Sequence, residues 1–316
     1  MTVLVPNNFS EESIALLTNA NLNVLTTTVA QNQLENFINS NSINVLIVRN
    51  TVEISAQLID SCQSLKLIGQ IGTSMDNIAV EHAINKGLKV INTPNASVNS
   101  VAELVFAHLY SMTRFLHQAN REMPLEGDVR FNDLKKQFST GTELRGKTLG
   151  IIGFGRTGQA VAKIALGVGM RVIAHCSSIK TTTLTLPFYN GTSVNFEITT
   201  QPLNTVLSEA DFISLHTPKQ DNYLIGESEI NHMKKGVGII NTSHGSVIDE
   251  VALIKAVETK NVTFAALDVF ESEPKPEIQI LMNPEISLSP HIAGTTLESQ
   301  ERSYLELAEQ ITHLLQ

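Results

Sequence analysis

The sequence predicts an α/β protein with two parallel-sheet domains, and three observations support this fold class. Short apolar runs alternate with amphipathic helical segments over residues 1–96. A glycine-rich turn joins an apolar strand to a helix at residues 149–166. The alternation of strand and helix resumes over residues 211–267. Strands that alternate with helices build parallel sheets, because each connection must cross back over the sheet.

The first domain is expected to hold five strands and several helices. The strands are expected near residues 3–5, 24–25, 45–48, 65–71 and 89–91, and the helices near 11–17, 34–38 and 80–85. No glycine-rich turn follows its first strand, so this domain is not itself an obvious nucleotide-binding unit. Asn92-Thr93-Pro94-Asn95 is a turn signal, and the domain crossing is placed after it.

A long helix is expected over residues 98–122, because its apolar residues recur on one face. Residues 124–140 are polar and charged, which predicts an exposed excursion. Further on, Asn190-Gly191 lies between two β-rich runs and predicts a hairpin. The remaining strands are expected at 211–216, 237–241 and 262–267, and the remaining helices at 249–258 and 295–315.

The glycine-rich turn has the pattern of a dinucleotide site. Gly153 would make the tight turn, Gly155 would let the backbone approach a pyrophosphate, and Gly158 would let the helix pack on the strand. The helix N-terminus offers free N–H groups and the positive end of the helix dipole. The sequence Gly-x-Gly-x-x-Gly is weak evidence alone, but it is much stronger between a buried strand and a helix.

The acidic residue that usually ends the second strand of such a fold is missing. The strand 171–175 is followed by Cys176, two serines and Lys180, so no carboxylate is available for the adenosine ribose. One interpretation is that NAD binds through its pyrophosphate and apolar contacts. The other is that His175, the serines and Lys180 accept a 2′-phosphate, so that NADP is used. Both stay open, with a small preference for NAD.

Composition restricts the classes of partner. The chain has 316 residues, 42% of them hydrophobic, and a net charge of −9, which argues against nucleic acid or an anionic membrane as the main partner. The two cysteines, Cys62 and Cys176, have no paired spacing and suit a reducing cytoplasm. No signal peptide or membrane-spanning segment is expected. No metal site is expected, because the His and Glu residues lack ligand spacing.

Four polar loops follow the later strands, at residues 215–218, 241–245, 268–274 and 289–294. Open α/β sheets bind ligands at the carboxyl ends of their strands, which is where these loops lie. Several of them carry histidine or acidic residues. A histidine beside a carboxylate forms a general acid/base couple, because the carboxylate orients the ring and favours its protonated form.

Several motifs make a resemblance specific. GKTLGIIGFGRTG, LHTP, MKKGVGIIN, VIDEVAL, ALDVFESEP and SPHIAG follow one another in the second half of the chain, and GTSMDNI and NTPNASVNSVAELVFAHL lie in the first. In this order they resemble the D-isomer-specific 2-hydroxyacid dehydrogenase family over nearly the whole chain. The resemblance implies a Rossmann dinucleotide-binding domain, residues 97–289, inserted in a flavodoxin-like substrate domain, residues 1–96 completed by 290–316. It also implies an active site in the cleft between them and a homodimer formed through the nucleotide domain.

The resemblance also implies a reaction and its residues. A hydride would pass between NAD(P) and the C2 atom of a D-2-hydroxy acid or 2-oxo acid, while His291 and Glu273 handle the proton. Arg49 would suit a substrate phosphate, and the loop of Gln70, Ile71, Gly72, Thr73 and Ser74 would hold the substrate carboxylate. The implied cofactor-binding residues are Gly153, Gly155, Arg156, Thr157, Gly158, Cys176, His216, Thr217, Pro218, Thr242, Ser243, Asp268 and Gly294.

Four positions depart from the family pattern. His244 stands where the family has a catalytic Arg, and Cys176 where it has the ribose-binding Asp. Ser74 replaces a glycine, and Gln70 stands where Arg is common. A histidine is only partly charged near neutral pH and cannot form a guanidinium fork. Two interpretations follow: an enzyme in which His244 serves with altered preference or rate, or a nucleotide-binding paralogue with little turnover.

Overall fold

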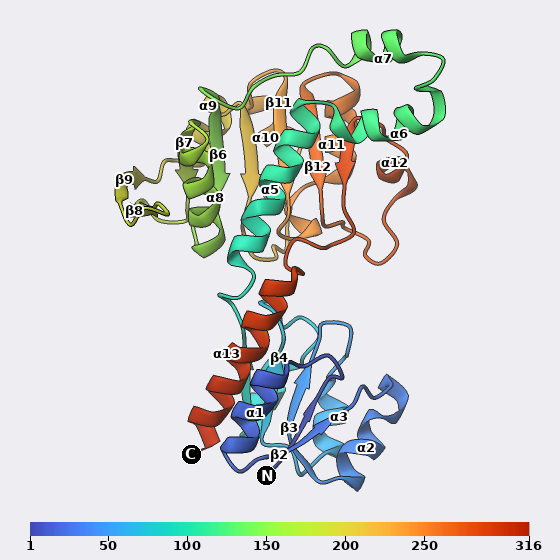
Figure 1. The fold of residues 1–316 in the computed structure, drawn as a ribbon, viewed down its shortest axis with the longest axis vertical. Coiled ribbons are helices and arrows are strands. Elements are labelled where there is room, and N and C mark those ends of the chain that lie inside the picture. The colour runs from blue at the N-terminus through green and yellow to red at the C-terminus, as the bar shows by residue number, and fades with distance from the viewer. Residues whose placement is uncertain (316) are drawn as a thin grey trace. The chain divides into compact units, whose positions relative to one another are not determined.

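The computed structural model describes residues 1–315 and divides the chain into two compact units (Figure 1). Unit 1 contains Met1–Val98 and the segment from Gly294 onward, and unit 2 is Asn99–Ala293. The sequence placed these boundaries at residues 96 and 289, a few positions earlier in each case. No helix among residues 1–315 is both long and apolar enough to span a membrane.

Unit 1 is built on a five-stranded parallel sheet. Its strands are β1 (Thr2–Val5), β2 (Asn23–Thr26), β3 (Ile43–Val48), β4 (Leu67–Gln70) and β5 (Lys89–Asn92). They run in the order β2-β1-β3-β4-β5. This is the flavodoxin-like order, as expected, and all five strands were predicted from their apolar runs.

Helices cover both faces of this sheet. α1 (Glu11–Asn19) and α13 (Leu297–Leu315) share one apolar core with the sheet. In that core Tyr304 and Leu307 of α13 are buried with Val3 and Val45 of the strands. The other face is covered by η1 (Gln31–Gln33), α2 (Leu34–Ser40), α3 (Ala56–Ser61) and α4 (Val80–Asn85). The sequence therefore folds into three layers although its last helix is far from the rest of unit 1 along the chain.

Unit 2 contains a six-stranded parallel sheet. Its strands are β6 (Thr148–Ile152), β7 (Arg171–His175), β10 (Phe212–Leu215), β11 (Val237–Asn241), β12 (Val262–Leu267) and β13 (Ile286–Leu288). Their order is β7-β6-β10-β11-β12-β13. A Rossmann sheet of order 3-2-1-4-5-6 has a third strand outside the second. Here the chain instead forms a separate antiparallel hairpin, β8 (Thr181–Pro187) and β9 (Ser193–Thr199).

The two faces of the unit 2 sheet have separate cores. α5 (Val98–Thr113), α8 (Arg156–Gly167) and the hairpin residues Leu184 and Leu186 pack on one face. The opposite face is covered by α9 (Leu203–Glu209), α10 (Glu227–His232), α11 (Glu250–Glu258) and α12 (Ile278–Leu281). The short 3-10 helix η2 (Gly245–Val247) follows β11. The sheet is therefore doubly wound, and its carboxyl edge carries the loops that the sequence singled out.

The single long helix expected over residues 98–122 is wrong. α5 ends at Thr113, and α6 (Leu116–Glu126) begins after Phe115, which has the left-handed φ of 56°. A left-handed residue interrupts the helical hydrogen bonds. The Phe115 ring lies 6.1 Å from the rings of Phe138 and Phe264, so tertiary contacts hold the break.

The segment 124–140 is also more ordered than an excursion. It completes α6 and contains α7 (Phe131–Gln137), whose Leu134 is buried. The other six residues of this short helix are exposed. One apolar residue per turn is too weak a periodic signal to reveal such a helix in the sequence.

Candidate active site

The glycine-rich turn between β6 and α8 brings the backbone close to its neighbours. Gly153 has a φ of 97°, and a Cβ there would lie 2.3 Å from the carbonyl oxygen of His216. A Cβ at Gly158 would lie 2.2 Å from the carbonyl oxygen of Gly153. Glycine is required at both positions for this packing. At Gly155, by contrast, a Cβ would meet no atom within 4 Å, so the backbone there is open to a ligand.

The N-terminus of α8 fits an anionic group. Gly155 is its N-cap and carries no side chain that could accept a hydrogen bond from the first turn. Arg156 and Thr157 open the helix, and no acidic residue lies in its first turn. The N–H groups and the positive end of the helix dipole therefore favour a phosphate or pyrophosphate at this point.

Two buried hydroxyls at the same sheet edge also fit a ligand. Oγ1 of Thr217, after β10, and Oγ1 of Thr242, after β11, are buried and have no hydrogen-bond partner among residues 1–315. Buried hydroxyls normally have a partner. Both positions were expected to bind the cofactor, so a polar ligand at this edge would supply what the protein does not.

His216 adds a neutral ring to the edge. Burial lowers its pKa from 6.5 to about 4, so the ring is neutral at physiological pH. Its Nε2 lies 2.8 Å from Oγ of Ser214 on β10. Ser243, in the neighbouring loop, donates from Oγ to Oδ1 of Asn241 at 2.9 Å and is engaged within the loop. The predicted residues around Pro218 and Ser243 thus lie at one edge of one sheet.

Cys176 follows β7, where the acidic residue of a typical site would stand. Burial by itself would raise the pKa of the thiol, but backbone hydrogen bonds from Ser178 and Phe154 and the charge of Lys180 outweigh it, so the pKa is lowered. Lys180 has an exposed side chain. Nδ1 of His175 pairs with the carbonyl oxygen of Gln201 at 3.0 Å. The residues from Cys176 to Lys180 thus include no carboxylate and one lysine.

The sequence-predicted acid/base pair is assembled. Nδ1 of His291 lies 2.8 Å from Oε2 of Glu273, and Oε1 of Glu273 accepts a hydrogen bond from the Phe270 N–H at 2.9 Å. The pair remains accessible, with side-chain exposures of 52% for His291 and 35% for Glu273. The carboxylate occupies one ring nitrogen and thereby leaves Nε2 to exchange a proton with a ligand.

Asp268 holds the backbone that carries His291. It is fully buried, and its carboxylate accepts hydrogen bonds from the N–H groups of Ile292 and Ala293 at 2.9 Å and from Oγ of Ser289 at 2.5 Å. Its carbonyl oxygen accepts from the His291 N–H at 2.8 Å. The sequence placed Asp268 beside the nicotinamide, whereas in the structure its side chain is surrounded by protein.

His244 lies in the loop between β11 and η2 and is partly buried. Its carbonyl oxygen accepts from Nδ2 of Asn241 at 2.8 Å. A Cβ on the next residue, Gly245, would lie 2.0 Å from the carbonyl oxygen of Phe270. The loops that carry His244 and Glu273 are therefore in backbone contact, and neither can move far without the other.

Hydrogen bonds of Glu250, Glu271 and Tyr223 also hold these loops, and they are called the Glu250–Glu271 brace below. The N–H of Glu250 donates to Oε1 of Glu271 at 2.8 Å, and the N–H of Glu271 donates to Oε1 of Glu250 at 2.9 Å. The hydroxyl of Tyr223 donates to Oε2 of Glu271 at 3.0 Å. Burial raises the pKa of the Glu250 carboxyl, and the nearby carboxylates add to this effect. The loops after β10, β11 and β12 are thus tied together.

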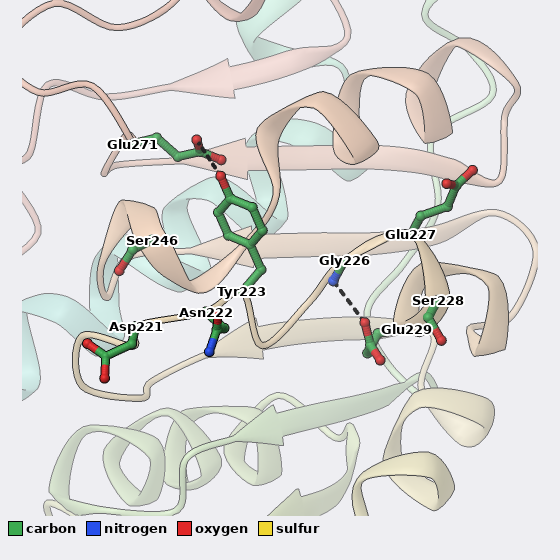
Figure 2. Close-up of a pocket in the computed structure, with 9 residues that line it drawn as sticks. All are labelled: Asp221, Asn222, Tyr223, Gly226, Glu227, Ser228, Glu229, Ser246 and Glu271. Atoms are coloured by element: carbon green, nitrogen blue, oxygen red, sulfur yellow. Dashed lines mark hydrogen bonds between the residues drawn. The ribbon is translucent and has the colours of Figure 1, made fainter.

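Next to this brace lies a cavity of about 700 Å³, shown in Figure 2. Its lining residues are Asp221, Asn222, Tyr223, Gly226, Glu227, Ser228, Glu229, Ser246 and Glu271. None of them was expected from the sequence to bind cofactor or substrate. Three of the four carboxylates are engaged: Glu271 by Tyr223, Glu229 by the Gly226 N–H and Glu227 by Lys255. The cavity shares Tyr223 and Glu271 with the contacts that tie the three loops together.

In unit 1, Arg49 follows β3 and is partly buried. Its Nη2 donates to Oε1 of Gln300 at 3.0 Å and to the hydroxyl of Tyr304 at 2.5 Å, both on α13. Among residues 1–315 it has no carboxylate partner. The two neutral contacts orient the guanidinium and leave its charge uncompensated, which suits an anionic ligand.

The loop after β4 has backbone N–H groups without a partner among residues 1–315, and two of them are adjacent. The N–H groups of Ile71 and Gly72 donate within unit 1, to Val48 and Thr93, whereas those of Thr73 and Ser74 have no partner among residues 1–315. Gln70 is 1% exposed, and its amide pairs with Asn77. The side chain of Gln70 is therefore used inside unit 1. Gly294 is the residue at which the chain re-enters unit 1.

Comparison with known proteins decides the family. Residues 106–293 match the NAD-binding domain of the D-isomer specific 2-hydroxyacid dehydrogenases. The chain belongs to this family. The resemblance seen in the motifs is thereby confirmed, and unit 2 is its NAD-binding domain. Within residues 1–315 no three His, Cys, Asp or Glu side chains group as metal ligands.

Individual relatives carry different names. A hydroxypyruvate reductase of Thermotoga maritima is 39% identical over 85% of this chain and 84% of its own length. A D-3-phosphoglycerate dehydrogenase of Methanocaldococcus jannaschii is 35% identical over 99% of this chain, which spans 57% of that relative. The solved structure of an acyclic imino acid reductase with NADPH and D-Arg has a TM-score of 0.81 and 27% identity, over 100% of this chain and 97% of that one. The printed names of these relatives point to different substrates.

The sequence did not predict two sets of contacts that support the candidate site residues. The Glu250–Glu271 brace and the contacts of His108 with Ser287 and Ser289 join residues far apart in the chain. Only His108 left a signal, since it is a polar residue among the apolar residues of α5.

Proposed function

We propose that this protein is an NAD(P)-dependent D-2-hydroxyacid dehydrogenase in which His291 and Glu273 form the acid/base couple. The observation that carries the proposal is the 2.8 Å contact between His291 Nδ1 and Glu273 Oε2 at the carboxyl edge of the unit 2 sheet. The bound cofactor would supply the hydride acceptor or donor. The chain itself has to bind the acid, orient its C2 atom and exchange one proton.

The proton is the task of His291. In the reducing direction its Nε2–H donates to the ketone oxygen as the hydroxyl forms, and in the oxidising direction neutral Nε2 takes the hydroxyl proton. Glu273 holds the other ring nitrogen and stabilises the protonated ring. The backbone anchor at Asp268 keeps His291 in place.

The substrate carboxylate is assigned to the free N–H groups of Thr73 and Ser74. Arg49 is assigned to a second anionic group, because its guanidinium is oriented by two neutral partners and has no carboxylate beside it. A phosphate meets this requirement. We therefore propose 3-phosphohydroxypyruvate and 3-phosphoglycerate as the substrate pair, as in the D-3-phosphoglycerate dehydrogenases of serine biosynthesis, and a cytoplasmic location.

A substrate panel tests this proposal. Steady-state rates are measured with 3-phosphohydroxypyruvate, hydroxypyruvate and glyoxylate, each with NADH and NADPH. Arg49→Ala should raise KM for the phosphorylated substrate by about tenfold or more and change KM for glyoxylate little, since glyoxylate has no second anion. An equal loss on both substrates would assign Arg49 to the fold and remove the phosphate from the proposal.

His291→Ala tests the couple itself. It should reduce kcat by about 10² to 10⁴ while nucleotide binding survives, because general acid catalysis contributes that much. His313→Ala, at an exposed position on α13, is the matched control and should leave kcat unchanged. Unchanged turnover in His291→Ala would mean that another group moves the proton.

The alternative function is a nucleotide-binding paralogue with little turnover, and His244 is the observation that favours it. A guanidinium can bind a reacting carboxylate in two places, whereas an imidazole cannot. Tight binding of NADH or NADPH together with no reduction of any 2-oxo acid in the panel would support this alternative and contradict the enzyme.

A further inference from the structure

A buried histidine, His108, is connected through hydrogen bonds to the loop that carries His291. His108 is on α5, 5% exposed, and both of its ring nitrogens have partners. Nδ1 lies 2.9 Å from Oγ of Ser287, and Nε2 lies 2.9 Å from Oγ of Ser289. Ser287 is on β13 and Ser289 directly follows it. The imidazole therefore joins α5 to the end of the last strand.

One of these serines continues to Asp268. Oγ of Ser289 donates to Oδ1 of Asp268 at 2.5 Å, and that carboxylate accepts the N–H groups of Ile292 and Ala293. The buried contacts Ser287–His108–Ser289–Asp268, called the His108 chain below, thus end on the two residues that follow His291. Ser287 is the end of the His108 chain opposite to Asp268, and its hydroxyl has no hydrogen bond with Asp268.

The His108 chain has one consistent direction. Because Ser289 gives its proton to Asp268, its oxygen must accept from His108, so the proton of the neutral ring is on Nε2. Nδ1 is then an acceptor and takes the hydroxyl proton of Ser287. Burial lowers the pKa of His108, which the charge of Asp268 opposes and that of His117 on α6 reinforces. Burial thus favours the neutral ring that this direction requires, and every side-chain polar atom of the His108 chain has a partner.

We propose that His108 is a positioning residue for the proton couple, acting through Ser289 and Asp268 on the backbone of residues 291–293. This inference rests on the proposed function, in which His291 is the acid/base. His108 fixes the Ser289 hydroxyl, the hydroxyl holds one oxygen of Asp268, and Asp268 holds the backbone on either side of Ile292. His291, with its left-handed φ of 54°, is then aimed at Glu273.

The two serines give a matched pair of variants. Ser289→Ala removes the hydrogen bond that connects His108 to Asp268. Ser287→Ala removes an equally long contact with the same ring but leaves the connection to Asp268 in place. We expect Ser289→Ala to lower kcat by about tenfold, because a small misplacement of a reacting group is costly, and to leave the Kd for nucleotide unchanged. Ser287→Ala should keep kcat within about twofold. Thermal unfolding of both variants controls for general destabilisation.

Two substitutions of the ring itself sharpen the test. In His108→Gln the amide nitrogen can take the place of Nε2 and keep the contact with Ser289. In His108→Asn the amide oxygen can take the place of Nδ1 and accept from Ser287, so only this contact is kept. The inference requires Gln to retain most of kcat and Asn to resemble Ser289→Ala. Equal losses in both, with equal unfolding temperatures, would overturn it.

A readout without turnover separates this inference from the proposed function. The proton on His291 Nδ1 is observed by NMR in the absence of substrate. It should be sharp in wild type and Ser287→Ala, and exchange-broadened in Ser289→Ala, where the contact with Glu273 is loosened. Failure of the whole substrate panel would contradict the proposed function but leave this NMR result intact. Identical spectra in the two serine variants would contradict the positioning role alone.

Discussion

At the scale of single residues, position 244 separates this chain most from its family. The loop backbone is fixed from both sides, by Asn241 and by the approach of Gly245 to Phe270, so a change of side chain should not move it. We predict that His244→Arg raises kcat/KM on an accepted 2-oxo acid by about tenfold or more, since a charged bidentate contact contributes about 1.5 to 3 kcal/mol. The measurement is kcat/KM from about pH 6 to 9, with most of the gain at the alkaline end, where an imidazole is neutral and a guanidinium is not.

The control for this experiment is His244→Lys, which restores a charge without the fork. If Arg restores activity and Lys does not, geometry is the missing element. If neither changes kcat/KM at any pH, the low-turnover paralogue becomes the better interpretation, with Ser74 as the next position to change.

The motifs predicted that His291 and Glu273 would lie together, but not how buried the neighbouring residues are. Glu273 and His291 were found from motifs, because each motif is a short contiguous run. Gln70 and Asp268 were placed at the ligand site by their motifs, which did not show that both side chains are buried. Burial depends on what other segments bring to a position, and a single sequence does not contain that information locally.

At the scale of elements, the residues that follow β7 are expected to set the preference between NADH and NADPH. Cys176 offers no carboxylate to repel a 2′-phosphate, and Lys180 is exposed nearby. We predict Kd values for NADPH and NADH within roughly tenfold of each other, a gap of about 1.4 kcal/mol. Fluorescence titration with both cofactors measures it. Cys176→Asp should weaken NADPH and spare NADH, whereas Cys176→Ser should change neither, and a preference of wild type for NADH above about a hundredfold would contradict the argument.

Strands were easier to predict than helix ends. Each parallel strand is a short apolar run between turn residues. The run is apolar throughout because helices cover both faces of the sheet and bury both sets of alternating side chains. The break at Phe115 has no glycine or proline to announce it and is held by distant aromatic rings. The hairpin β8–β9 was expected from Asn190-Gly191, but the sequence did not show that it forms a separate sheet and leaves β7 without a further strand beside it.

At the scale of the whole molecule, stability should depend on pH through buried histidines. Burial lowers the pKa of His108, His117 and His216, the last to about 4. Between about pH 6.5 and 4 the unfolded chain therefore binds more protons than the folded one, and the free energy of unfolding rises with pH. Glu250, whose pKa is raised, acts in the opposite direction.

The variant His216→Asn measures how much His216 contributes to this pH dependence of stability. Wild type should lose about 1 to 2 kcal/mol more than this variant between pH 7 and pH 5, since only wild type has a His216 to protonate on unfolding. Chemical denaturation at the two pH values measures it. His313→Asn, exposed on α13, should behave as wild type. A variant that loses as much as wild type would show that His216 contributes nothing.

Assembly is the second prediction at this scale. The described surface of unit 2 exposes Leu125, Val129 and Phe131 on α6, α7 and the turn between them, at 77%, 78% and 56%. Large apolar side chains that are exposed within a short segment can mark a contact with another chain. We predict a homodimer through this surface, measured by sedimentation. Leu125→Asp with Val129→Asp should give a monomer, and Val251→Glu, equally exposed on α11, should not. A wild-type monomer at micromolar concentration would contradict this.

The place of α13 in unit 1 has a consequence for synthesis on the ribosome. Strands β1–β5 are translated before residues 99–293. One face of their sheet is partly covered by Tyr304, Leu307 and Ile311, which are translated after those residues. Unit 2 is continuous and can fold while the chain is still being extended. The nascent first sheet must meanwhile keep an apolar face uncovered, a condition that favours aggregation or chaperone binding. Translation of the last helix therefore sets the earliest time at which unit 1 becomes native.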